Sequence, residues 1–164
     1  MRAILIIDHG SVRAEANHML SCVANLLQSM VGDAVLVRFA HMELAEPSIE
    51  QTFAACVEAG ATEVIAFPYM LSPGKHSTRD IPRLVSEAAA KFPGILFRVT
   101  PAFGVNRQLA EVIAERAGVE LITNVSDDVG GRCWDAAQCI GTCGPACAAT
   151  IANAELSPSD NRLS

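Results

Sequence analysis

Apolar residues along the chain alternate between short continuous runs and longer stretches with helical spacing. Four mainly aliphatic runs, typical of strands buried on both faces of a sheet, span residues 4–7, 34–39, 63–67 and 95–99. Apolar residues at every third or fourth position, typical of one face of a helix, occupy residues 14–30, 47–60, 80–91 and 106–117. Gly32 and Gly60 are suited to helix ends, and Pro82 fits the third helix because it lies in the first turn.

Strands that alternate with helices, at about 30 residues per unit, predict a parallel sheet with right-handed crossovers. The expected fold class is therefore α/β, with a doubly wound, four-stranded parallel sheet. We assign residues 1–118 to this domain and residues 119–164 to a Cys-rich C-terminal extension. Within the extension, residues 119–123 are compatible with a further short strand, and residues 154–164 are typical of a disordered end.

Composition and charge exclude several classes of protein. The chain is 51% hydrophobic and 18% charged, which is typical of a folded domain. It has no run of about 20 apolar residues that would cross a bilayer, and the first run stops at Asp8 with no cleavage pattern of a signal peptide. We therefore expect no membrane partner and a cytosolic location, or an organelle stroma if a targeting segment has been removed. The net charge of −6 argues against nucleic-acid binding.

Polar side chains follow three of the predicted strands. His9 comes after the first strand, His41 and Glu43 after the second, and His76 in a Pro-, Gly- and Ser-rich loop, residues 68–78, after the third. In an open α/β sheet, ligands bind outside the carboxyl ends of the strands, so these residues are expected on one rim. The fourth histidine, His18, lies within the first helix and is expected to be a surface or packing residue.

Two neutral imidazoles suit divalent ions such as Fe, Co, Ni and Zn, and a nearby carboxylate can accept protons or act as a third ligand. His9, His76 and Glu43 therefore predict a metal site with open positions. Each residue taken alone is also compatible with an ordinary loop position, and Glu43 with a charge near a helix N-terminus. His41 could orient Glu43 or be structural.

Several neighbouring residues are candidates for contact with a substrate. Gly10 allows the backbone to approach a ligand closely, and Ser11 is a candidate N-cap of the first helix as well as a binding residue. Basic residues beside the histidines form a local cluster that would suit a ligand with several carboxylates, although a solvated loop is the alternative. The residues assigned to substrate contact are Gly10, Ser11, Arg13, Lys75, Ser77 and Arg79.

The six cysteines fall into two groups. Cys22 and Cys56 lie in apolar helical patterns and are expected to be buried small hydrophobes. The other four crowd together in the extension, which in a cytosolic chain indicates metal or redox chemistry. They are Cys133, Cys139, Cys143 and Cys147. Four thiolates suit an iron–sulfur cluster or zinc, and an unliganded redox-sensitive tail is the third possibility.

Three motifs resemble those of the sirohydrochlorin chelatases, the class II chelatase family. They are DHGS at residues 8–11, AHMELAEPSI at 40–49 and FPYMLSPGKHSTRDIP at 67–82. The resemblance covers residues 1–118, and the second motif is similar to the ferrochelatase branch that serves sirohaem synthesis. It implies a flavodoxin-like fold, a homodimer, and a lyase that inserts a metal into a metal-free tetrapyrrole.

The resemblance also assigns roles within the site. It implies that His9 and His76 hold the metal and that Glu43 accepts a proton from the pyrrole nitrogens. Fe²⁺ is favoured, Co²⁺ for cobalamin follows, and Ni²⁺ is possible because such sites discriminate poorly among these ions. Related chelatases in some lineages carry C-terminal cysteines that bind iron–sulfur clusters.

Two other classes of function would place different demands on these residues. A non-catalytic carrier of metal or tetrapyrrole would use the same histidines but would need no base at Glu43. A signalling receiver domain would need two acidic residues after the first strand and an aspartate at the end of the third. The sequence offers only Asp8 at the first place and Phe67 and Pro68 at the second, which excludes a receiver.

Overall fold

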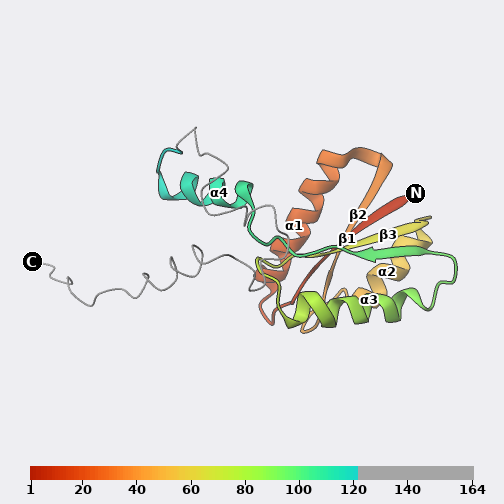
Figure 1. Cartoon of the computed structure of the whole chain (residues 1–164). Coiled ribbons are helices and arrows are strands. Elements are labelled where there is room, and N and C mark those ends of the chain that lie inside the picture. Colours follow the sequence, from red (N-terminus) through yellow and green to blue (C-terminus); the bar gives the residue numbers. More distant parts are fainter. Residues whose placement is uncertain (122–164) are drawn as a thin grey trace, which may run out of the picture. The chain divides into compact units, whose positions relative to one another are not determined.

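The structure is a computed structural model and describes residues 1–121. The described residues fall into two units, residues 1–104 and residues 105–121 (Figure 1). The first unit holds the sheet and most of the helices. Its strands are β1 (Arg2–Asp8), β2 (Val35–His41), β3 (Glu63–Pro68) and β4 (Leu96–Val99), and its α-helices are α1 (Ala14–Val31), α2 (Ile49–Glu58) and α3 (Ile81–Ala89). The described part of the second unit is α4 (Arg107–Ala117) with its flanking residues.

All four strands are parallel and lie in the order β2-β1-β3-β4. The chain moves from β1 outward to β2 and then returns to β3 on the other side of β1. The strand order therefore reverses between β1 and β3, which is the switch point where ligands bind in open α/β sheets. The predicted α/β class and the four-stranded parallel sheet are confirmed.

Helices cover the sheet unevenly. Figure 1 shows α1 on one side and α2 and α3 on the other. Leu5 and Ile7 of β1 are fully buried against Phe53 of α2 and Val85 of α3, whereas Ile6 faces the smaller cluster around α1. Burial on both faces explains why β1 is a continuous aliphatic run rather than an alternating one.

The ends of the helices depart from the predicted ones in informative ways. Helix α2 begins at Ile49, directly after its N-cap Ser48. The Ser48 hydroxyl accepts a hydrogen bond from the backbone N–H of Gln51, and the Gln51 side-chain oxygen accepts one from the backbone N–H of Ser48. This reciprocal capping box satisfies two amides that would otherwise lack partners. Pro47 therefore precedes the helix instead of starting it. Helix α3 begins at Ile81, and a short π-helical turn, η2 (His76–Asp80), occupies the end of the predicted loop.

Two predictions about α1 are wrong. Its N-cap is Arg13 and not Ser11, because the Ser11 hydroxyl accepts from the Arg13 amide outside the helix. Cys22 is exposed rather than buried, with its sulfur 3.6 Å from Nε2 of the surface residue His18. Cys56 is buried in α2, as predicted. Within residues 1–121, no helix is both long enough and apolar enough to cross a membrane.

Candidate functional site

The carboxyl ends of β1 and β2 stay joined beyond the last paired residues of the sheet. The Met42 amide donates to the Asp8 carbonyl at 2.9 Å, and the Glu43 amide donates to the His9 carbonyl at 3.1 Å. These bonds lie directly beyond Asp8 and His41, the last pair of the parallel ladder. As a result, the backbones that carry His9 and Glu43 are held side by side.

A buried pair of side chains lies beneath this junction. Nδ1 of His41, a residue only 1% exposed, lies 2.6 Å from Oδ1 of Asp8. The same Asp8 oxygen accepts from the Gly10 amide at 2.9 Å. Among the residues that the structure describes, Nε2 of His41 is buried and has no hydrogen-bond partner, which is uncommon for a buried ring nitrogen. The proton of a neutral His41 ring therefore belongs on Nδ1, where the Asp8 carboxyl group can accept it.

Gly10 permits the close approach of the two loops. Its φ of +82° is favourable only for glycine. A Cβ at this position would lie 2.0 Å from the Glu43 carbonyl oxygen and 3.1 Å from Cβ of His41. Gly10 is thus required for the close approach of its loop to the Glu43 loop, and its approach to a ligand stays a prediction. Leu44, directly after Glu43, also has a left-handed φ of 64°, a strained conformation of the kind that accumulates at functional sites.

His9 and Glu43 touch through their side chains. Nε2 of His9 lies 2.8 Å from Oε1 of Glu43, and both side chains are about half exposed at the rim. Nδ1 of His9 lies 3.2 Å from the Gly10 carbonyl oxygen. A nitrogen and a carboxyl oxygen at 2.8 Å share a proton. The pair is therefore arranged to hold a proton and to pass it on.

His76 reaches the same rim from the β3 side. Its ring centroid lies 5.1 Å from that of His9, in an edge-to-face arrangement. Nδ1 of His76 lies 3.0 Å from Oδ2 of Asp80, and Nε of Arg79 donates to the other Asp80 oxygen at 3.0 Å. The hydrogen bond from Arg79 is the largest cause of a lowered pKa at Asp80; desolvation opposes it, and the hydrogen bond from His76 lowers the pKa further. The sequence reading did not single out Asp80, although its i, i+4 spacing from His76 was a usable signal.

The residues predicted to contact substrate have different surroundings. Arg13, Lys75 and Arg79 are exposed, and Arg79 forms an ion pair with Asp80. Ser77 is 6% exposed and exchanges hydrogen bonds with the Gly74 backbone. Its hydroxyl holds the loop together, and its contact with substrate stays a prediction.

The metal-binding potential of the rim is limited. Among residues 1–121, no three His, Cys, Asp or Glu side chains are placed to hold a metal ion together. His9 and His76 supply two nitrogens, and the Glu43 contact occupies Nε2 of His9. An ion held here would keep open positions and would displace the shared proton, as suits a metal in transit more than a structural one. The four C-terminal cysteines lie outside the described residues.

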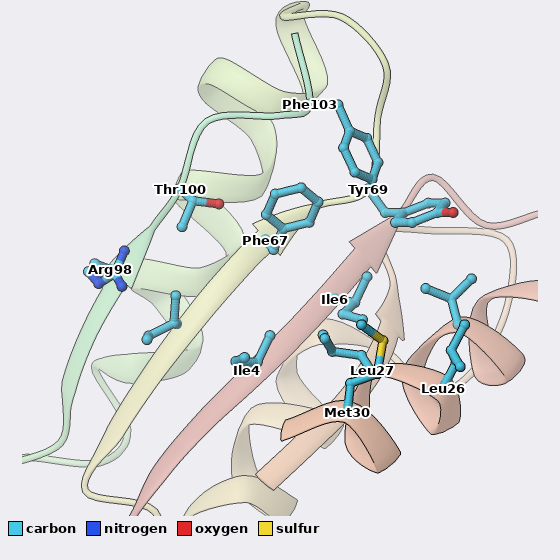
Figure 2. A pocket seen from close by; sticks show the side chains of 12 residues that line it. Ile4, Ile6, Leu26, Leu27, Met30, Phe67, Tyr69, Arg98, Thr100 and Phe103 are labelled. Carbon is cyan, nitrogen blue, oxygen red and sulfur yellow. The ribbon is translucent and has the colours of Figure 1, made fainter. Parts of the chain in front are cut away.

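An apolar groove of about 450 Å³ lies on the α1 face of the sheet. Figure 2 shows Phe67, Tyr69 and Phe103 at the carboxyl end of this groove, with Phe103 packed edge-to-face on the other two rings. The groove shares no lining residue with the histidine rim. It is lined by Ile4, Ile6, Val23, Leu26, Leu27, Met30, Ile65, Phe67, Tyr69, Arg98, Thr100 and Phe103.

Fold and site together define a doubly wound α/β protein whose rim combines two imidazoles with a carboxylate at the switch point of the sheet. A sequence model of the CbiX family matches residues 3–119. The chain therefore belongs to the CbiX family, as the motif resemblance to the class II chelatases predicted.

Curated relatives and solved structures agree with this assignment. The chain is 39% identical over 139 residues to the chloroplastic sirohydrochlorin ferrochelatase of Arabidopsis thaliana, covering 85% of this chain and 59% of that protein. It is 30% identical over 133 residues to the sirohydrochlorin cobaltochelatase of Priestia megaterium, covering 77% and 42%. The sirohydrochlorin chelatase SirB of Bacillus subtilis subspecies spizizenii, in complex with cobalt, superposes with a TM-score of 0.67 at 28% identity, covering 71% and 50%. The chain thus spans about half the length of these relatives.

Proposed function

We propose that this protein is a sirohydrochlorin chelatase, a lyase that inserts a divalent metal into the metal-free tetrapyrrole. The observation that carries the proposal is the meeting of His9, Glu43 and His76 at the switch point, with 2.8 Å between His9 and Glu43 and 5.1 Å between the two imidazole rings. The names of the Arabidopsis and Priestia relatives support the same reaction.

Metal insertion forms bonds from the pyrrole nitrogens to the metal and releases two N–H protons, so the site must both offer the metal and remove protons. His9 and His76 hold the incoming ion through ring nitrogens, which suit this group of divalent metals. Glu43 accepts one proton, and a histidine freed of the metal accepts the second before both pass to solvent. The contact between Glu43 and His9 places the base beside the metal donor.

The tetrapyrrole carries several carboxylates, whereas the protein has a net charge of −6. Attraction must therefore come from local cations. Arg13, Lys75 and Arg79 are exposed and supply positive charge for this purpose. Replacing Lys75 by Met should raise KM more than it lowers kcat, because the contact is present in the bound substrate and in the transition state alike.

Three divalent metals suit the imidazole ligands of the rim. Fe²⁺ is favoured, in line with the plant ferrochelatase, and Co²⁺ follows, in line with the Priestia cobaltochelatase and the cobalt complex of SirB. Ni²⁺ remains a third candidate because imidazole ligands accept all three ions. Anaerobic incubation of metal-free sirohydrochlorin with each ion, followed by absorbance, tests this directly. A failure of all three ions to speed spectral conversion above the protein-free rate would refute the chelatase.

A non-catalytic carrier that uses the same rim is the competing function. Replacing Glu43 by Gln separates the two, because the amide cannot accept a proton. For an enzyme, insertion should slow by about 100-fold or more while tetrapyrrole binding persists; for a carrier, the variant should behave as wild type. Glu46→Gln is the matched control, since the Glu46 carboxylate lies in the same loop and bonds to the Ser48 amide.

Three further parts of the proposal concern assembly, location and the C-terminal extension. We expect a homodimer, which light scattering of the full chain tests. We also expect a plastid or cytosolic location, which a fluorescent fusion tests, and the name of the chloroplastic relative favours the stroma. The absorbance spectrum of anaerobically purified protein would distinguish an iron–sulfur cluster on Cys133, Cys139, Cys143 and Cys147 from zinc or no ligand.

A further inference from the structure

The segment that carries His76 has an unusual local geometry. Residues His76–Asp80 form a π-helical turn, which the Ile81 amide closes by donating to the His76 carbonyl. Such turns are rare and are frequent at functional sites. Here the turn joins the loop after β3 to α3 and places the side chains of His76 and Asp80 in contact.

Asp80 is held on both sides. Its side chain is 16% exposed. One carboxylate oxygen is hydrogen-bonded to Nδ1 of His76, and the other accepts a hydrogen bond from Nε of Arg79. A carboxylate fixed in this way can only accept, so the shared proton of the His76 contact belongs to Nδ1. The lone pair of His76 is then on Nε2, on the opposite side of the ring from Asp80.

We propose that Asp80 is a positioning residue, which holds His76 in the Nδ1–H form and at the ring angle that presents Nε2 to the metal beside His9. This inference rests on the proposed function for the identity of the ligand as a divalent metal. A carboxylate behind a metal-binding imidazole fixes both its tautomer and its orientation. His9 has a weaker version of the same arrangement, a carbonyl 3.2 Å from Nδ1.

The tautomer is measurable without activity or metal. In metal-free protein labelled with ¹⁵N-histidine, with the His76 signals assigned from a His76→Gln variant, wild-type His76 should show a protonated Nδ1 and a bare Nε2. In Asp80→Ala the proton should move mainly to Nε2, and Asp80→Glu should restore the wild-type pattern at least in part. A wild-type His76 with its proton on Nε2 would overturn the proposal before any variant is made.

Metal affinity gives the second measurement. Titration with Co²⁺ alone, followed by visible absorbance, should show about 10-fold or greater weakening in Asp80→Ala and a smaller loss in Asp80→Glu. Glu87→Ala is the matched control, because Glu87 forms an exposed i, i+4 pair with Arg83 on α3, and it should bind Co²⁺ as wild type does. Unchanged affinity in Asp80→Ala, no Co²⁺ binding by wild type, or a loss of affinity with the Nδ1–H form retained would each contradict the positioning role.

These outcomes are separate from those of the chelatase assay. A protein that shows the tautomer change and the loss of Co²⁺ affinity, but converts no sirohydrochlorin, keeps the role of Asp80 and loses the proposed function. A protein that inserts metal equally well with and without Asp80 keeps the function and loses the positioning residue.

Discussion

Replacing Asp8 by Ala would leave both nitrogens of the buried His41 ring without a partner among residues 1–121, since Nε2 already has none there. The change removes a 2.6 Å bond to a carboxyl group and a 2.9 Å bond from the Gly10 amide. A bond to a charged group contributes about 1.5–3 kcal/mol and a half-buried amide bond about 1 kcal/mol. We therefore expect the free energy of unfolding to fall by about 3 kcal/mol.

The other side of the pair should behave differently. His41→Leu removes the ring with its unpartnered nitrogen, while Asp8 is partly exposed and keeps the Gly10 bond. His41→Leu should lower the free energy of unfolding by about 1 kcal/mol, because replacing a buried polar group by an apolar one of similar size destabilises less than leaving that group unsatisfied. The double variant should lose about 2 kcal/mol, less than the sum of the single changes, which gives a coupling energy of about 2 kcal/mol.

Urea denaturation of the wild type, both single variants and the double variant at pH 7.5, followed by far-ultraviolet circular dichroism, measures this cycle. The m-values should agree, so that shifts in midpoint report stability alone. A loss of less than about 1 kcal/mol in Asp8→Ala, or additivity of the two changes to within about 0.5 kcal/mol, would refute the stabilising role of the Asp8–His41 pair.

Further predictions concern single positions. Gly10→Ala should lower the free energy of unfolding by about 2–3 kcal/mol, because a Cβ would lie 2.0 Å from the Glu43 carbonyl oxygen at a φ of +82°. Gly74→Ala is the control, since no described atom lies within 4 Å of the added carbon, and it should leave the free energy of unfolding unchanged in the same urea assay. Mass spectrometry after brief iodoacetamide treatment of native protein should find Cys22 alkylated and Cys56 intact, and equal labelling would contradict the burial of Cys56. Burial raises the pKa of the Cys56 thiol from 9.0 to about 11, so the unfolded chain ionises first. The stabilisation from this thiol should be complete below pH 9 and lost between about pH 9 and 11, a loss that Cys56→Ala should not show.

Much of the fold follows from local patterns in the sequence. The aliphatic run of β1 predicts a strand buried on both faces, and Asn106 and Gly118 bound α4 as a cap and a left-handed end, close to the predicted limits. The rim could also be predicted, because the carboxyl ends of parallel strands share one edge. His9, Glu43 and His76 each follow a strand, which predicts a shared rim, but their contacts also require that β1 lie between β2 and β3.

Tertiary structure decided what local pattern leaves open. One cysteine in a helical stripe fits either face of α1, and packing put Cys22 on the exposed side. Ser11 fits an N-cap, but the helix begins after Arg13. The contacts of His41 with Asp8 and of His76 with Asp80 depend on strand register and on a π-turn. Sequence determined which side chains reach the rim because strand ends are local features, whereas side-chain orientation depends on contacts between distant segments, which only the folded chain forms.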